Sequence, residues 1–119
     1  MTLNEFYDAV GSDYSEVLNR LNKEERIVKY LLKFASENTL EDFEKSYETG
    51  NFEEAFRVVH SMKGMCLNLG LLKLCDVSSD VCEDLRNGPP KEDISEKIDI
   101  LRKEYNIAMD NIKLISKTV

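Results

Sequence analysis

His60, the only histidine of the chain, is followed by a lysine three residues later and a glycine four residues later. An imidazole can form a covalent intermediate as a nucleophile, and a lysine one helical turn away can hold phosphoryl oxygens. Gly64 is unexpected, because glycine inside a helix costs about 0.5 to 1 kcal/mol relative to alanine. We interpret its missing Cβ as access to His60 for a partner's backbone or a phosphoryl group.

Motifs for other kinds of catalysis are missing from the sequence. It contains no glycine-rich phosphate loop, no HExxH and no GxSxG motif. We therefore expect no ATP site, no cofactor of the chain's own and no turnover by this chain alone. A metal site formed by His60 with Cys66 or acidic residues is a weaker alternative, because no pair of ligands has a standard spacing.

The segment around His60 has the spacing of an amphipathic helix that ends at Gly70. At about 100° per residue, His60 lies roughly 115° from the centre of the apolar stripe, which predicts an exposed imidazole. Its polar face also carries Glu53, Arg57, Gly64 and Asn68. The apolar stripe consists of Phe52, Ala55, Phe56, Val59, Met62, Cys66 and Leu69.

Four further stretches also have helical spacing, and no strand pattern competes with them. A short helix is expected from Tyr14 to Leu21 with Ser12 as its cap, and residues 23–49 predict one long helix or two abutting helices that meet near Asn38. Residues 71–85 and 94–115 predict the remaining two.

Short connections between helices favour antiparallel neighbours. We therefore predict an all-α fold, an antiparallel up-and-down four-helix bundle with a short N-terminal helical cap. Residues 1–119 are expected to form one domain, with approach helices in residues 1–22 and the bundle from about residue 23 to 116.

Composition limits the class of partner. A net charge of −7 argues against nucleic acid or an anionic membrane, since both are bound mainly through basic patches. No apolar run approaches the roughly 20 residues of a membrane-spanning helix, and the three cysteines form no CxxC pair. We expect a cytoplasmic monomer with reduced, buried cysteines and a protein partner.

The segment AFRVVHSMKGMCLNLGLLKL resembles the histidine-containing phosphotransfer (HPt) domains. The positions that match the pattern of this family are His60, Lys63, Gly64, Gly70 and Leu74. The resemblance implies a four-helix bundle in which a phosphoryl group moves between His60 and an aspartate of a response-regulator receiver domain. It also implies a sensor histidine kinase as a partner and Mg²⁺ on the receiver.

The resemblance also suggests roles for the neighbouring residues. His60 is the expected phosphoacceptor and Lys63 the residue that stabilises the phosphoryl group. Arg57, Gly64, Leu67 and Asn68 are the expected docking residues. The alternative is a helical interaction module, a relative that binds receiver or kinase domains without transferring a phosphoryl group.

Overall fold

A computed structural model describes the backbone of residues 1–118 and the side chains of residues 1–115. The described residues form helices and no strand, so the predicted all-α class is confirmed. The helices are α1 (Leu3–Ala9), α2 (Tyr14–Leu21), α3 (Glu24–Ser36), α4 (Thr39–Glu48), α5 (Phe52–Leu69), α6 (Leu72–Leu85) and α7 (Ser95–Thr118).

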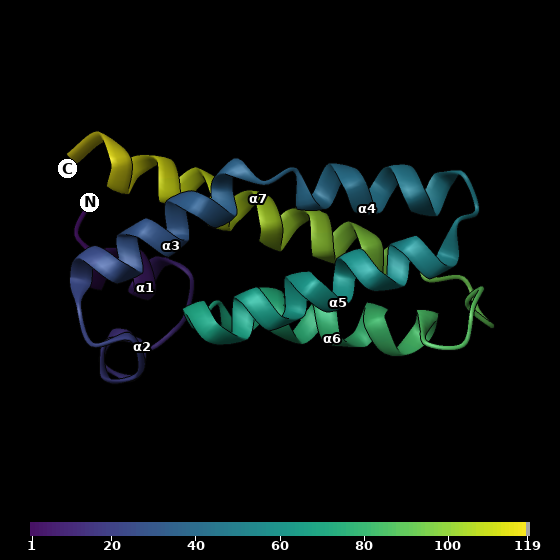
Figure 1. The fold of residues 1–119 in the computed structure, drawn as a ribbon, viewed down its shortest axis with the longest axis horizontal. Helices are drawn as coiled ribbons and strands as arrows, with labels where there is room; N and C mark the ends of the chain where they lie inside the picture. Colours follow the sequence, from purple (N-terminus) through teal and green to yellow (C-terminus); the bar gives the residue numbers. More distant parts are fainter. Residues whose placement is uncertain (119) are drawn as a thin grey trace.

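The molecule is elongated, with principal extents of 42 × 24 × 20 Å. Helices α4 to α7 run along its length, and α1 and α2 lie at one end (Figure 1). Helix α5 packs against α4 on one side and α6 on the other, while α6 also packs against α7. Helix α5, which carries His60, is therefore held along both flanks and keeps one face open.

Local sequence explains where α5 begins and ends. The Asn51 side chain accepts a hydrogen bond from the Glu54 amide, and Glu53 and Glu54 favour the positive end of the helix dipole. Gly70 ends the helix with a φ of 73°, a left-handed conformation that suits glycine. The predicted boundaries of this helix are confirmed.

The apolar stripe of α5 enters the core as its spacing predicts. Ala55, Val59, Met62 and Cys66 have no exposed surface. Full burial of a large apolar side chain contributes about 1.5 to 3 kcal/mol, so this stripe fixes the rotation of α5 about its axis. The same rotation places His60 outward. Cys75 and Cys82 are also buried and unpaired, as predicted.

The N-terminal segment differs from its prediction in the residue that caps α2. Residues 1–22 form two helices, because Thr2 and Glu5 make a capping box that starts α1. Asp13, and not Ser12, caps α2 through the Ser15 amide. The Ser12 hydroxyl instead accepts a hydrogen bond of 3.3 Å from the Leu72 amide, at the start of α6.

Residues 23–49 form two helices, which decides between the two arrangements that the sequence left open. Glu37 has an extended backbone, with a ψ of 138°, so α3 stops there and α4 starts after Asn38. No helix in the described part of the chain is both long and apolar enough to cross a bilayer.

Candidate functional site

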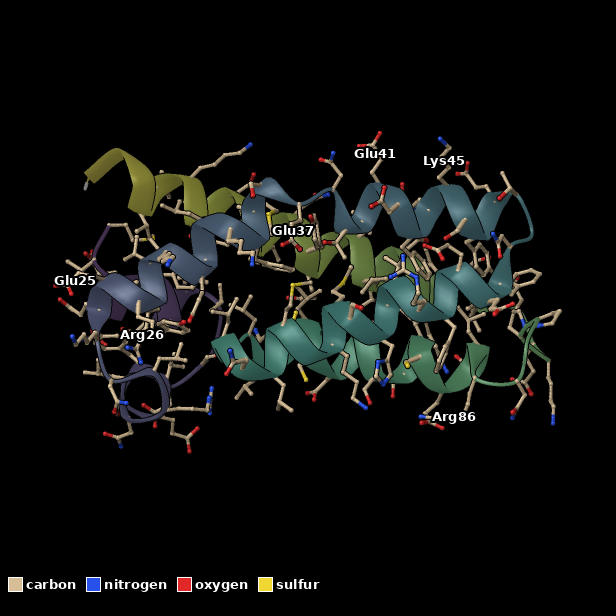
Figure 2. All side chains as sticks on the ribbon, viewed as in Figure 1. Glu25, Arg26, Glu37, Glu41, Lys45 and Arg86 are labelled. Carbon is tan, nitrogen blue, oxygen red and sulfur yellow. The ribbon has the colours of Figure 1, made fainter. Side chains whose placement is uncertain are left out.

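His60 lies on the exposed face of α5, as its position on the helical wheel predicts. Its ring is tilted by 35° against the Phe56 ring one turn earlier, with 5.7 Å between the centroids. The Arg86 guanidinium lies over the same Phe56 ring, 5.7 Å from its centroid. Figure 2 shows Arg86 at the C-terminal end of α6. Phe56 therefore supports the imidazole from one side and leaves its outer side in solvent.

Arg57 stands on the same face of α5 and is engaged by Glu54. Its Nε donates a 2.9 Å hydrogen bond to Glu54 Oε2, and its Nη2 donates a second bond to Glu54 Oε1. Hydrogen bonding to Arg57 lowers the pKa of Glu54. The positive charge of Arg57 is thus largely offset. His60 and this pair line one shallow depression, together with Asn51, Glu53, Phe56 and Ser61.

Lys63 is half-buried at the edge of α5 that faces α6. A hydrogen bond from Arg86 lowers the pKa of Glu83 on α6, and the charge of Lys63 adds to this effect. Within the described residues Lys63 forms no ion pair at hydrogen-bonding distance. The structure therefore places Lys63, an ammonium group without such a pair, one helical turn from His60 and at the α6 side of α5.

Gly64 lies one turn beyond His60 on the open face. A Cβ built at this position would meet no atom within 4 Å outside its own helix. Gly64 is therefore not needed for close packing between helices. Open space at this position is what a role in access to His60 requires. It also means that a mutation here can change access to His60 without lowering the stability of the fold.

We expect Gly64→Ala to stabilise the protein by up to about 1 kcal/mol, because alanine is the better helix former at an exposed position. Gly64→Gln should also remain folded, while slowing phosphoryl transfer because its side chain would stand beside the imidazole. Thermal denaturation measured alongside transfer tests both expectations. A lower melting temperature for Gly64→Gln with normal transfer by the folded fraction would contradict the access role.

Leu67 and Asn68 extend the open face toward the end of α5. The Leu67 side chain is 57% exposed, more than any other large apolar side chain among the described residues. Asn68 is also exposed. The structure therefore brings all six predicted site residues onto one helix. Arg57 is engaged by Glu54, whereas Gly64, Leu67 and Asn68 are open to solvent.

The last carbonyls of α5 receive partners from the N-terminal helices. Arg20 of α2 donates from Nη2 to the carbonyls of Leu67 and Asn68, at 3.2 and 2.9 Å, and from Nε to Asn68 at 3.2 Å. The hydroxyl of Tyr7 in α1 donates a 2.7 Å bond to the Leu69 carbonyl. Helix ends leave such carbonyls unsatisfied, so α1 and α2 complete the helix that carries His60.

A comparison with protein families gives this arrangement its context. The model of the Hpt domain matches residues 30–111, which include α4, α5 and α6. The chain belongs to the HPt domain family. No curated protein and no solved structure matched in the corresponding comparisons. HPt domains are phosphocarrier modules of phosphorelays, not enzymes, and they interact with receiver domains and kinases.

Two features of this HPt site escaped the sequence reasoning. Phe56 was assigned to the apolar stripe, although its position one turn before His60 already placed the two rings together. Arg20 was overlooked because its partners are backbone carbonyls 47 and 48 residues away, which no local pattern reveals. As for the metal alternative, Cys66 lies in the core and His60 in solvent.

Proposed function

We propose that this HPt domain carries a phosphoryl group on His60 and exchanges it with an aspartate of a receiver domain. The observation that supports this most directly is the exposure of the only imidazole on a helix face where nothing crowds Gly64. The test is to incubate the purified protein with a phosphorylated receiver. An acid-labile, base-stable label on this chain is expected, and its absence would contradict the proposal.

The transfer is a displacement at phosphorus. A lone pair of the His60 ring forms the nitrogen–phosphorus bond while the bond between phosphorus and the aspartyl oxygen breaks, and the carboxylate leaves with that electron pair. The reverse reaction returns the group to an aspartate. Catalysis is then mostly positioning and charge stabilisation. This chain supplies a nucleophile supported by Phe56 and a nearby cation, Lys63.

The remaining groups are assigned to the partner. We propose that Mg²⁺ and the acidic groups belong to the receiver, that a sensor histidine kinase loads the relay, and that this chain has neither an ATP site nor a cofactor. Its net charge of −7 suits protein partners better than nucleic acid or membrane. We place the relay in the cytoplasm, with the carrier as a monomer.

We further propose that residues 1–119 act as one domain. Its centre would be an antiparallel up-and-down four-helix bundle from about residue 23 to 116, whose first member is divided into α3 and α4. The packing of α5 between α4 and α6 supports this topology. Residues 1–22 would then be the cap on one end of that bundle.

Lys63→Ala is expected to slow transfer about 10- to 100-fold, the effect of losing one charged contact of about 1.5 to 3 kcal/mol. In this mechanism Lys63 interacts with the transferred phosphoryl group and not with the core, so the free energy of unfolding should change little. Rapid-quench transfer kinetics measure the effect. Lys45→Ala is the matched control, because this substitution removes the same charge from the outer side of α4 (Figure 2). Equal rates for the two variants would make Lys63 a bystander.

The second candidate is a relative that binds receiver or kinase domains without transfer. The exposed Leu67 on an open helix face favours it as much as it favours transfer, because either function needs a docking surface. Only loss of His60 separates the two, since binding without chemistry needs no imidazole.

A further inference from the structure

Arg20 is an exposed cation that is fixed in place at the end of the open face of α5. Three hydrogen bonds from Nε and Nη2 hold one edge of its guanidinium on the carbonyls of Leu67 and Asn68. Those bonds leave Nη1 unused. Backbone carbonyls carry no net charge, and no carboxylate in the described part of the chain forms an ion pair with Arg20. It therefore keeps its full charge in a fixed position.

The other arginines beside His60 differ from Arg20 in this respect. Arg57 pairs with Glu54, and Arg86 pairs with Glu83 at 2.6 Å. Each of these cations is offset by a carboxylate three residues earlier in the chain. Lys63 and Arg20 are not offset in this way: Lys63 lies at the edge of α5 that faces α6, and Arg20 lies at the C-terminal end of α5.

The sequence of α5 adds to this charge pattern. Although the chain has 23 acidic residues, residues 55 to 75 contain none. Helix α5 beyond Glu54 therefore contributes no carboxylate to its open face, and Glu37 at the end of α3 is the acidic side chain that lines a depression with Met65 and Asn68. An acidic partner would be repelled from most of this protein and accepted here.

Arg20 is close enough to His60 to share one docking footprint. Leu67 follows His60 by seven residues, which corresponds to about 10 Å along a helix axis. A typical interface covers about 800 Å² on each partner, a patch roughly 30 Å across. A protein centred on His60 would therefore reach the end of α5 and the guanidinium beside it.

We infer that Arg20 is a docking residue that binds a carboxylate of the receiver domain, and so extends the relay surface onto α2. The inference rests on the proposed function, in which the partner that docks on α5 is a receiver domain. A guanidinium held along one edge loses little conformational freedom on binding, and its free edge can bind a carboxylate. Residues outside the matched segment 30–111 thus contribute to partner recognition.

The test compares Arg20→Gln with Arg26→Gln. Arg26 is a matched control because it is also exposed and donates from Nη1 to a helix-end carbonyl, that of Leu21, at 3.2 Å. It lies at the beginning of α3 (Figure 2). Transfer is followed from a single-domain receiver charged with acetyl phosphate, over a range of receiver and NaCl concentrations.

For Arg20→Gln, the receiver concentration that gives half-maximal rate should rise about three- to ten-fold, with a weaker salt dependence and an unchanged maximal rate. Arg26→Gln should match the parent protein. Arg20→Lys should bring the receiver concentration for half-maximal rate most of the way back to the parent's value, because it keeps the positive charge.

A purely structural role for Arg20 predicts other results. In that case Gln and Lys would both lower the melting temperature, while the folded fraction would keep the parent's half-saturation, and the inference would be overturned. Equal effects of Arg20→Gln and Arg26→Gln would overturn it as well. If the parent protein transfers the phosphoryl group and Arg20→Gln does so with the same half-saturation, this inference alone is overturned. If the parent protein itself shows no transfer, the proposed function and the inference are overturned together.

Discussion

Replacement of His60 by glutamine should abolish labelling by a phosphorylated receiver, a loss larger than that expected for any other single change. The amide of glutamine is polar and of similar reach but is not a nucleophile of this kind, and no second histidine exists to accept the group. Substitutions at exposed positions usually change stability by less than about 0.5 kcal/mol, so the fold should persist. Quantifying acid-labile label by autoradiography and melting by circular dichroism measures both effects.

Binding of the receiver supplies the control for this experiment. If His60→Gln still binds an unphosphorylated receiver with the parent's affinity, the lost label reports lost chemistry. Label that persists on the variant would assign the phosphoryl group to another residue. A parent protein that binds receivers but never takes up label would instead favour the non-transferring interaction module.

Gly70→Ala should cause a larger loss of stability than the substitutions proposed at His60, Lys63, Gly64 and Arg20. Gly70 has a φ of 73°, where an L side chain costs roughly 1 to 2 kcal/mol. A Cβ there would also lie 2.3 Å from Cγ2 of Val17, so α2 would have to move. Overpacking of this kind costs about 1 to 3 kcal/mol, which gives an expected total of about 2 to 5 kcal/mol. Urea denaturation measures the free energy of unfolding.

Gly50→Ala separates backbone strain from crowding in that result. Gly50 has a similar φ of 78°, but a Cβ there would meet nothing within 4 Å. It should therefore lose only the conformational part, roughly 1 to 2 kcal/mol. Equal losses for the two variants would show that α2 adapts freely at Gly70. Adding Val17→Ala to Gly70→Ala should recover part of the lost free energy if crowding is the cause.

The sequence was most informative where packing and local capping agree. The boundaries of α5 follow from its stripe of apolar residues, from Asn51 and from Gly70, and the exposure of His60 follows from the same stripe. Gly64 was recognisable as a cost without a packing reason, and the open space around it is in keeping with that interpretation.

The N-terminal region was harder to predict for two separate physical reasons. Helix α1 is short, so its apolar residues show little periodicity, although Thr2 and Glu5 form a capping box that the sequence displays. The contacts of Tyr7 and Arg20 join positions far apart in the chain. Such contacts depend on the assembled fold and leave no spacing in the sequence.

The completion of α5 by Tyr7 and Arg20 has a consequence for how the autonomous folding unit is delimited. A chain trimmed to residues 30–111 would retain His60 and every residue of the HPt pattern, yet the Asn68 and Leu69 carbonyls would lose their side-chain donors. Gly70 would also lose Val17 as a neighbour. The homologous segment is therefore shorter than the cooperative one, and an expression boundary drawn at residue 30 would cut through the support of the histidine helix.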